Sequence, residues 1–330
     1  MKRKVLSLSL FLMLFFGTFW LQAQEYVQQT DLPTIYIETE GGRPIVSKED
    51  YVDAVLHYVD SNGVKTYDAL GVRGRGNSTW NLEKKPYRIK FAEKQEFMGP
   101  KRAKAKSWTL LANFADKTLL RNAVAACIGD FAGQPFTAGA QFVDLVLNGT
   151  YLGNYQLSDQ VEVRKKRVDI DEQDEIPTED ANITGGYFLE VDGWATAEPV
   201  YYKTNRIVSR QLEYIKNHMQ LFEDALFSSD FADPEKGYRP YVDSLTLASW
   251  YISTELTGNV DGFWSTYMYK KKDDQKFYWG PLWDYDIAFN NCNRVGDVSE
   301  ALMINKGFGG DLTQKWVLQM WKDPWFVQLI

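Results

Sequence analysis

Hydrophobic and polar residues alternate in many short stretches of this chain, a pattern typical of β-strands that bury one face. Two pairs of these stretches flank turn sequences, Asp60–Gly63 and Asn148–Gly149, and therefore predict β-hairpins. The strands predicted in this way lie at 34–38, 51–58, 64–72, 86–91, 108–111, 142–147, 151–157 and 186–192.

Three other stretches have a helical period, at 117–131, 211–226 and 243–257. Asp116 is placed to cap the first helix, and Gly258 stops the third. The apolar residues at helical spacing predict a buried face on each helix. On the first helix these are Leu120, Val124, Cys127, Ile128 and Phe131, and on the third they are Leu245, Ile252 and Leu256. Strands and helices together predict an α+β fold.

A hairpin predicted at 264–283 has aspartates on both sides of it. Asp261 follows the third helix, and Asp284 and Asp286 follow the hairpin. Because antiparallel strands return the chain to where it started, we expect these carboxylates to meet at one edge of a sheet. Phosphoryl transfer needs such a pair, one carboxylate to position the acceptor hydroxyl and one to hold the metal ion.

A glycine-rich loop at 74–80 precedes the strand at 86–91. Backbone N–H groups of such a loop can bind phosphate, and Lys85 or Lys90 could reach a nucleotide from the following strand. The loop does not have the GxxxxGK[ST] pattern of a Walker A motif. Taken alone, a glycine-rich loop of this kind is more often a structural hairpin turn than a nucleotide-binding loop.

The first residues are typical of a secretory signal peptide. Lys2, Arg3 and Lys4 precede the apolar run 5–21, and Ala23 offers a cleavage point, although an uncleaved anchor has a similar pattern. No later stretch is long and apolar enough to span a membrane. We therefore expect an exported protein that is periplasmic, extracellular or attached to the cell surface. The chain ends at Ile330 within a helical pattern, which indicates a fragment of a longer protein.

Composition argues against several function classes. The formal charge is −7, and −10 without residues 1–23, which disfavours nucleic-acid binding. With only two cysteines, Cys127 and Cys292, and two histidines, the chain lacks a zinc motif and gives little support to Ser-His-Asp catalysis. Cys127 is expected to be a buried thiol.

Several motifs spread over most of the chain occur in the order typical of one protein family. They are RGRGNSTW (73–80), KKPYRIKF (84–91), LLANFADKTLLRN (110–122), LVLNGTYLGNYQLSDQV (145–161), GYFLEVDG (186–193), GNVDGFWSTYMY (258–269) and GPLWDYD (280–286). Together they resemble the CotH (spore coat protein H) kinase family.

The resemblance implies an atypical two-lobed protein-kinase-like fold with antiparallel sheets and packed helices. The domain would occupy 24–330, with an N-lobe at about 30–160 and a C-lobe at about 161–330, after a signal peptide at 1–23. It implies that the protein uses ATP and Mg²⁺ to phosphorylate proteins of the cell envelope or outside the cell.

The resemblance also assigns roles to single residues. Asp261 would be the catalytic aspartate, Asp284 a metal ligand, and Asp286 a second ligand or a partner of the first. The nucleotide would contact Arg73, Asn77 and either Lys85 or Lys90. Kinases place a metal-binding asparagine five residues after the catalytic aspartate, where this chain has Thr266.

Two other functions remain open. The first follows from Thr266, because a hydroxyl is a poorer magnesium ligand than an amide oxygen. The domain could be a weak or inactive kinase-like module for binding or assembly at the surface. The abundant tryptophans also allow a glycosidase that uses Asp261 and Asp284.

Overall fold

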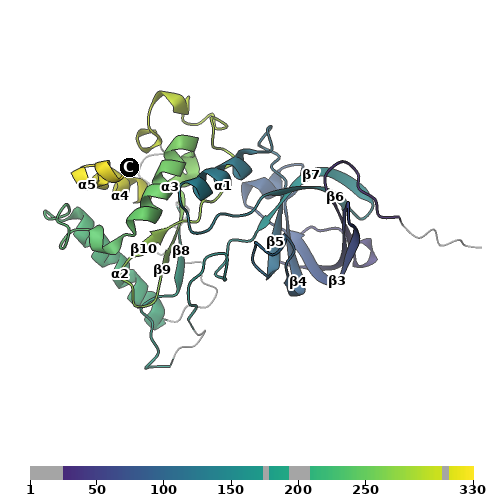
Figure 1. Cartoon of the computed structure of the whole chain (residues 1–330), viewed down its shortest axis with the longest axis horizontal. Helices are drawn as coiled ribbons and strands as arrows, with labels where there is room; N and C mark the ends of the chain where they lie inside the picture. Colours follow the sequence, from purple (N-terminus) through teal and green to yellow (C-terminus); the bar gives the residue numbers. More distant parts are fainter. Residues whose placement is uncertain (1–24, 174–177, 193–208, 307–311) are drawn as a thin grey trace, which may run out of the picture.

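The computed structural model describes residues 25–173, 178–192, 209–306 and 312–330, so the expected signal peptide at 1–23 lies outside the described residues. The fold is α+β, as the sequence predicts. A β-barrel and a mainly helical part lie side by side along the long axis of the molecule (Figure 1). Among the residues that the structure describes, no helix is long and apolar enough to cross a membrane.

The barrel is formed by the strands predicted for the first half of the chain. Its order is β1-β2-β3-β4-β5-β7-β6, and it closes where β1 pairs with β6 in parallel. The sequence predicts antiparallel sheets, but a closed ring of seven alternating strands must contain one parallel pair. The strands are β1 (Thr34–Thr39), β2 (Val52–Asp60), β3 (Gly63–Gly74), β4 (Tyr87–Gln95), β5 (Ala105–Leu111), β6 (Gln141–Leu147) and β7 (Thr150–Asp159).

The barrel interior is filled by apolar side chains at alternate strand positions. Val72, Ile89, Trp108 and Leu110 are fully buried there. The predicted turn between β6 and β7 is also present, because Asn148 (φ 49°) and Gly149 (φ 77°) adopt the left-handed conformation of a tight hairpin turn.

Helix α1 (Arg121–Phe131) lies between β5 and β6 in sequence, but it packs against α3 (Ser244–Thr257) of the helical part (Figure 1). Its buried residues are Ala125 and Gly129. The face predicted to be buried is wrong, because Leu120, Val124, Cys127 and Phe131 are exposed. The helix approaches its neighbours through small residues, and large apolar side chains do not fit there.

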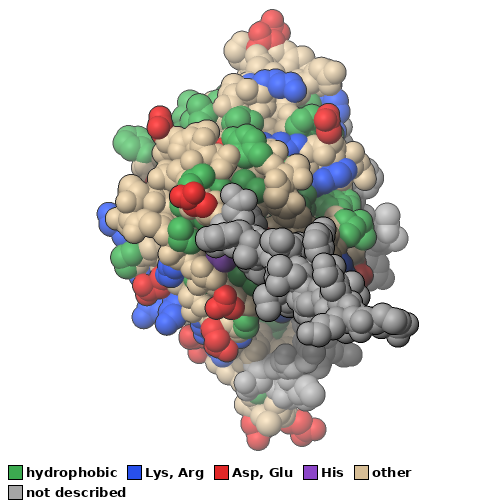
Figure 2. Space-filling view, turned by 90° about the vertical axis from the view of Figure 1, so that its right-hand side faces the viewer, with side chains coloured by type: hydrophobic (Ala, Val, Ile, Leu, Met, Phe, Trp, Pro, Cys, Tyr) green, Lys and Arg blue, Asp and Glu red, His purple; other side chains and the backbone are tan. Residues whose placement is uncertain are grey.

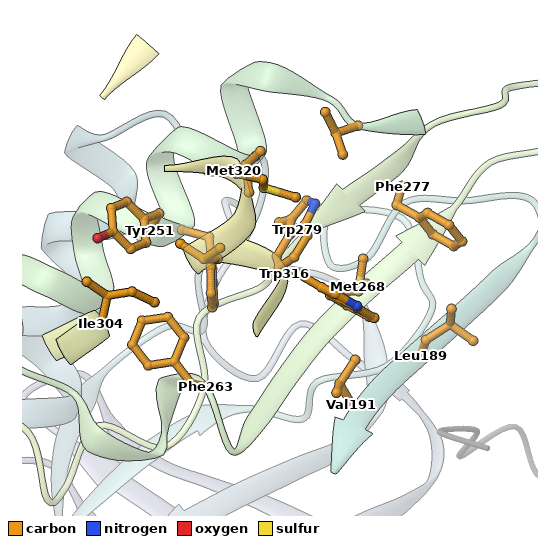
Figure 3. Packing of buried hydrophobic residues seen from close by; sticks show 14 of the residues in the cluster. Leu189, Val191, Tyr251, Phe263, Met268, Phe277, Trp279, Ile304, Trp316 and Met320 are labelled. Atoms are coloured by element: carbon orange, nitrogen blue, oxygen red, sulfur yellow. The ribbon is translucent and has the colours of Figure 1, made fainter. Parts of the chain in front are cut away.

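The helical part packs its helices against the sheet β10-β9-β8. Trp279 and Trp316 lie at the centre of its core beside Met268 (Figure 3). On α3, Leu245 and Leu256 are exposed and Trp250 is buried, so the predicted buried face of this helix is also wrong. The remaining elements are β8 (Tyr187–Asp192), α2 (Ser209–Phe227), β9 (Ser265–Lys270), β10 (Phe277–Trp279), α4 (Leu312–Met320) and α5 (Pro324–Leu329).

Candidate active site

A cavity of about 960 Å³ lies where the barrel meets the helical part. The barrel contributes the ends of β5 and β7 and the loop between β3 and β4, and the helical part contributes β8, β9 and the loops on either side of the β9–β10 hairpin. Its volume lies within the range of small-molecule sites in proteins. Both parts of the fold are therefore needed to form it.

The end of α3 places Asp261 in this cavity. Gly258 ends the helix in the left-handed conformation (φ 59°), and the short turn Val260–Gly262 follows. The fully buried Asn259 fixes this turn, because its Oδ1 accepts a hydrogen bond of 3.2 Å from the backbone N–H of Asp261. Arg294 also lines the cavity, and its Nη2 lies 3.8 Å from Oδ1 of Asp261.

The loop after β10 brings Asp284 and Asp286 to the same cavity. β10 pairs with β9, so the chain returns to the end of the sheet where β9 begins, close to Asp261. Asn122 of α1 supports the loop through Oδ1, which accepts a hydrogen bond from the backbone N–H of Tyr285 at 2.8 Å. Helix α1 thus positions the two carboxyls although it belongs to the barrel in sequence.

The surroundings of this pair favour the neutral form of its carboxyl groups. Burial raises the pKa of Asp286 to about 7, and the negative charges of Asp284, Asp261 and Asp116 add to the effect. The Asp284 side chain is open to the cavity, but protein surrounds it closely enough that desolvation raises its pKa as well. The nearby guanidinium of Arg75 partly opposes this increase.

A divalent cation would relieve the repulsion between the two carboxyls. The described residues contain no group of three or more His, Cys, Asp or Glu side chains arranged as metal ligands. Magnesium, however, is often held by one or two carboxylates together with water and substrate phosphates. The pair Asp284 and Asp286 fits that mode of binding.

The other predicted site residues divide between the cavity and the outside of the barrel. Asn77 lines the cavity together with Gly76, Ser78 and Thr79 of the glycine-rich loop. Arg73, Lys85 and Lys90 are not among the described residues that line it. Lys85 Nζ donates a hydrogen bond to the carbonyl of Trp80 at 2.8 Å. A contact between nucleotide and these three residues stays a prediction.

A comparison with protein-family models decides the family. Residues 72–330 match the model described as CotH kinase protein. The chain belongs to the CotH kinase family. The match covers all of the cavity residues described above, whereas β1, β2 and most of β3 precede it. Curated protein sequences give no match to the chain.

This CotH kinase domain has cavity residues that sequence reasoning missed. Two basic residues from the barrel side, Arg75 and Lys84, line the cavity, as does Arg294 from the loop after the acidic pair. Glu190 and Asp192 of β8 add further negative charge. Arg75 lies in the same glycine-rich motif as Arg73, and Lys84 directly precedes Lys85. The motifs therefore indicated the segments that form the cavity, but not which basic residue of each segment faces it.

The position where kinases carry a metal-binding asparagine points away from the cavity in this CotH domain. Thr266 is fully buried, and its hydroxyl donates a hydrogen bond of 2.7 Å to the carbonyl of Gly262. The neighbouring residues of β9, Ser265 and Tyr267, line the cavity instead. Thr266 therefore supports the turn that carries Asp261 and is not placed as a ligand.

Proposed function

We propose that this CotH family member is an exported atypical kinase, with two kinase-like lobes, that transfers the γ-phosphate of ATP to hydroxyl groups of secreted or surface proteins. Family membership supports a kinase-like function in general. The apolar run at 5–21 supports export. The observation that carries the proposal is that Asp261, Asp284 and Asp286 line one cavity between the barrel and the helical part.

Each side chain has a role that follows from its position. Asp261 would orient the acceptor hydroxyl and accept its proton. Asp284 and Asp286 would hold Mg²⁺, which stabilises the charge on the phosphate oxygens when it is bound. Arg75 and Lys84, which line the same cavity, would contact those oxygens, and the loop at 76–79 would offer backbone N–H groups.

The test is the transfer of labelled γ-phosphate from ATP to a protein acceptor. Wild type should transfer label in the presence of Mg²⁺, and Asp261→Asn should reduce the rate by about 10²- to 10⁴-fold, the usual contribution of a general base. Asp284→Asn should also lower the rate and raise the Mg²⁺ concentration that transfer requires. Asp224→Asn is the matched control, because Asp224 is an exposed carboxylate on α2. Transfer at the wild-type rate in both variants contradicts the assignment.

An inactive binding module is the second candidate, and Thr266 is the observation that favours it. This buried hydroxyl cannot supply the second metal ligand of a typical kinase. Thermal unfolding with ATP and Mg²⁺ separates the candidates, because a ligand that binds only the folded state raises the melting temperature. A kinase requires such an increase at millimolar nucleotide, whereas a module without a nucleotide site shows none.

A further inference from the structure

Three basic side chains lie on the outside of the barrel at β3 and β4. Val72 and Ile89 point into the barrel core, so by strand alternation Arg73, Arg88 and Lys90 face outwards. Arg73 of β3 is directly opposite Arg88 of β4, and Lys90 is the next outward residue along β4. We call Arg73, Arg88 and Lys90 the basic strip.

The described part of the chain offers the basic strip no direct ion pair. Like charges directly opposite on neighbouring strands destabilise a sheet, yet no ion pair joins any of the three to a carboxylate of the described residues. Arg73 and Lys90 instead share the ring of Tyr51, at 5.1 and 5.7 Å from its centre. Lys90 is exposed, and Arg73 and Arg88 are half-buried. Nη2 of Arg88 donates a hydrogen bond of 3.2 Å to the hydroxyl of Ser107, which is neutral. An acidic chain thus keeps a positive surface free to bind an anion.

The basic strip leads directly to the cavity. Arg75 lies two residues beyond Arg73 and lines the cavity wall. Arg88 lies in the same row of strand positions as a second cavity residue, because it is opposite Thr109 of β5, which is opposite Ser158 of β7, and Ser158 lines the cavity. A ligand on the basic strip would therefore extend from the outside of the barrel to the entrance of the cavity.

We propose that the basic strip binds an acidic, extended segment of the acceptor protein and so directs a nearby hydroxyl into the cavity. This inference rests on the proposed kinase function. Alternate residues of an extended chain are about 6.6 to 6.8 Å apart, the same spacing that separates Arg88 from Lys90 along β4. A segment lying along β4 therefore carries carboxylates at alternate positions, one near Arg88 and Arg73 and the next near Lys90.

Direct binding tests the inference without any need for catalysis. The probe is a fluorescein-labelled 12-residue peptide of alternating Glu and Ser, compared with one of alternating Gln and Ser. Wild type should bind the acidic peptide more tightly, and the preference should weaken at high salt. The double variant Arg73→Gln/Lys90→Gln should bind it about five- to tenfold more weakly, as expected for the loss of two partly exposed ion pairs.

A matched control exists on the same strand. Lys65 of β3 also lies over a tyrosine ring, at 4.9 Å from the centre of Tyr67, but eight residues away from Arg73. Lys65→Gln should bind the acidic peptide like wild type. Thermal unfolding of each variant shows whether it is folded, and only folded variants enter the comparison.

The outcomes separate the basic strip from the kinase function. Equal binding of both peptides, unchanged binding in the double variant, or equally tight binding of single-stranded DNA overturns the inference. In a transfer assay, the double variant should raise KM for the acidic peptide and leave KM for ATP unchanged. A higher KM for ATP would assign Arg73 and Lys90 to the nucleotide and overturn the inference. If wild type transfers phosphate to neither peptide, the kinase function is contradicted, whereas weaker acidic-peptide binding in the double variant still supports the basic strip as the docking site.

Discussion

Neighbouring residues of β9 divide their side chains between the cavity and the core. Ser265 lines the cavity and donates a hydrogen bond of 2.8 Å to Glu190, whereas Thr266 is enclosed and bonded to Gly262. A residue at position 266 cannot reach a metal ion without a change in the strand. A comparison by sequence position alone would miss this distinction.

We therefore expect Thr266→Asn to destabilise the fold without increasing phosphate transfer. The larger amide must fit a fully buried position and replace the bond to Gly262, which should cost roughly 1–3 kcal/mol. Chemical denaturation measures the change in the free energy of unfolding. Thr150→Asn, an exposed strand threonine, is the control and should change stability by less than about 0.5 kcal/mol. Higher activity in Thr266→Asn would show that this position does face the metal site.

At the scale of elements, α1 joins the two parts of the molecule through a close contact. A Cβ atom on Gly129 would lie 2.6 Å from Cδ1 of Leu282 and 2.9 Å from Cγ2 of Thr137. Both neighbouring side chains are buried. The approach of α1 to the loop that carries Asp284 therefore depends on the absence of a side chain at position 129.

Gly129→Ala should destabilise the protein by roughly 1–3 kcal/mol through this overlap. Helix propensity alone predicts the opposite sign, a gain of about 1 kcal/mol. Urea unfolding distinguishes the two effects. In the Leu282→Ala background Cδ1 is absent, so the cost of Gly129→Ala should become smaller. A stabilised Gly129→Ala protein would mean that α1 is not packed as closely as described.

The same contact explains which parts of the fold could be predicted from sequence. Strands alternate with a period of two, and Asn148–Gly149 has a local turn preference, so the barrel hairpins were predictable. The buried face of α1 was not, because it consists of Ala125 and Gly129 and the large apolar residues face solvent. Hydrophobic spacing identifies the buried face only where large side chains form it.

The candidate site was predictable only in part for a similar reason. The order of helix, Asp261, hairpin and Asp284 specifies a local path that brings the carboxylates together. The direction of each basic side chain is set by residues far away in the sequence. Arg75 lies over the ring of Trp283, Lys84 bonds to the carbonyl of Asn154, and Arg294 pairs with Asp261. Such contacts have no signature in a single sequence.

On the scale of the whole molecule, His218 links stability to pH. It lies buried between α2 and the β9–β10 hairpin, with Nε2 2.8 Å from the carbonyl oxygen of Gln275. Burial lowers its pKa below the usual value of 6.5, and the charge of Lys270 acts in the same direction. The folded state therefore holds a neutral imidazole under conditions where the unfolded chain is already protonated.

The contribution of His218 to the free energy of unfolding should consequently decrease as the pH falls below about 6.5 and until the folded-state pKa is reached. The raised pKa of Asp286 acts with the opposite sign over this range, so the prediction concerns the difference between wild type and His218→Gln. Each unit of pKa difference corresponds to about 1.4 kcal/mol. Denaturation at pH 7.5 and 5.5 measures the loss, which should be smaller in His218→Gln. An identical pH dependence in wild type and His218→Gln would exclude His218 as the source.

Closure of the barrel sets a lower limit on the piece of chain that can fold by itself. The family match begins at residue 72, whereas the ring is completed by β1 and β2. A truncated protein starting at the family boundary would leave β4 and β6 with free hydrogen-bonding edges. Exposed edges of this kind recruit strands from other molecules, so such a truncation is expected to precipitate, and the autonomous unit begins no later than Thr34.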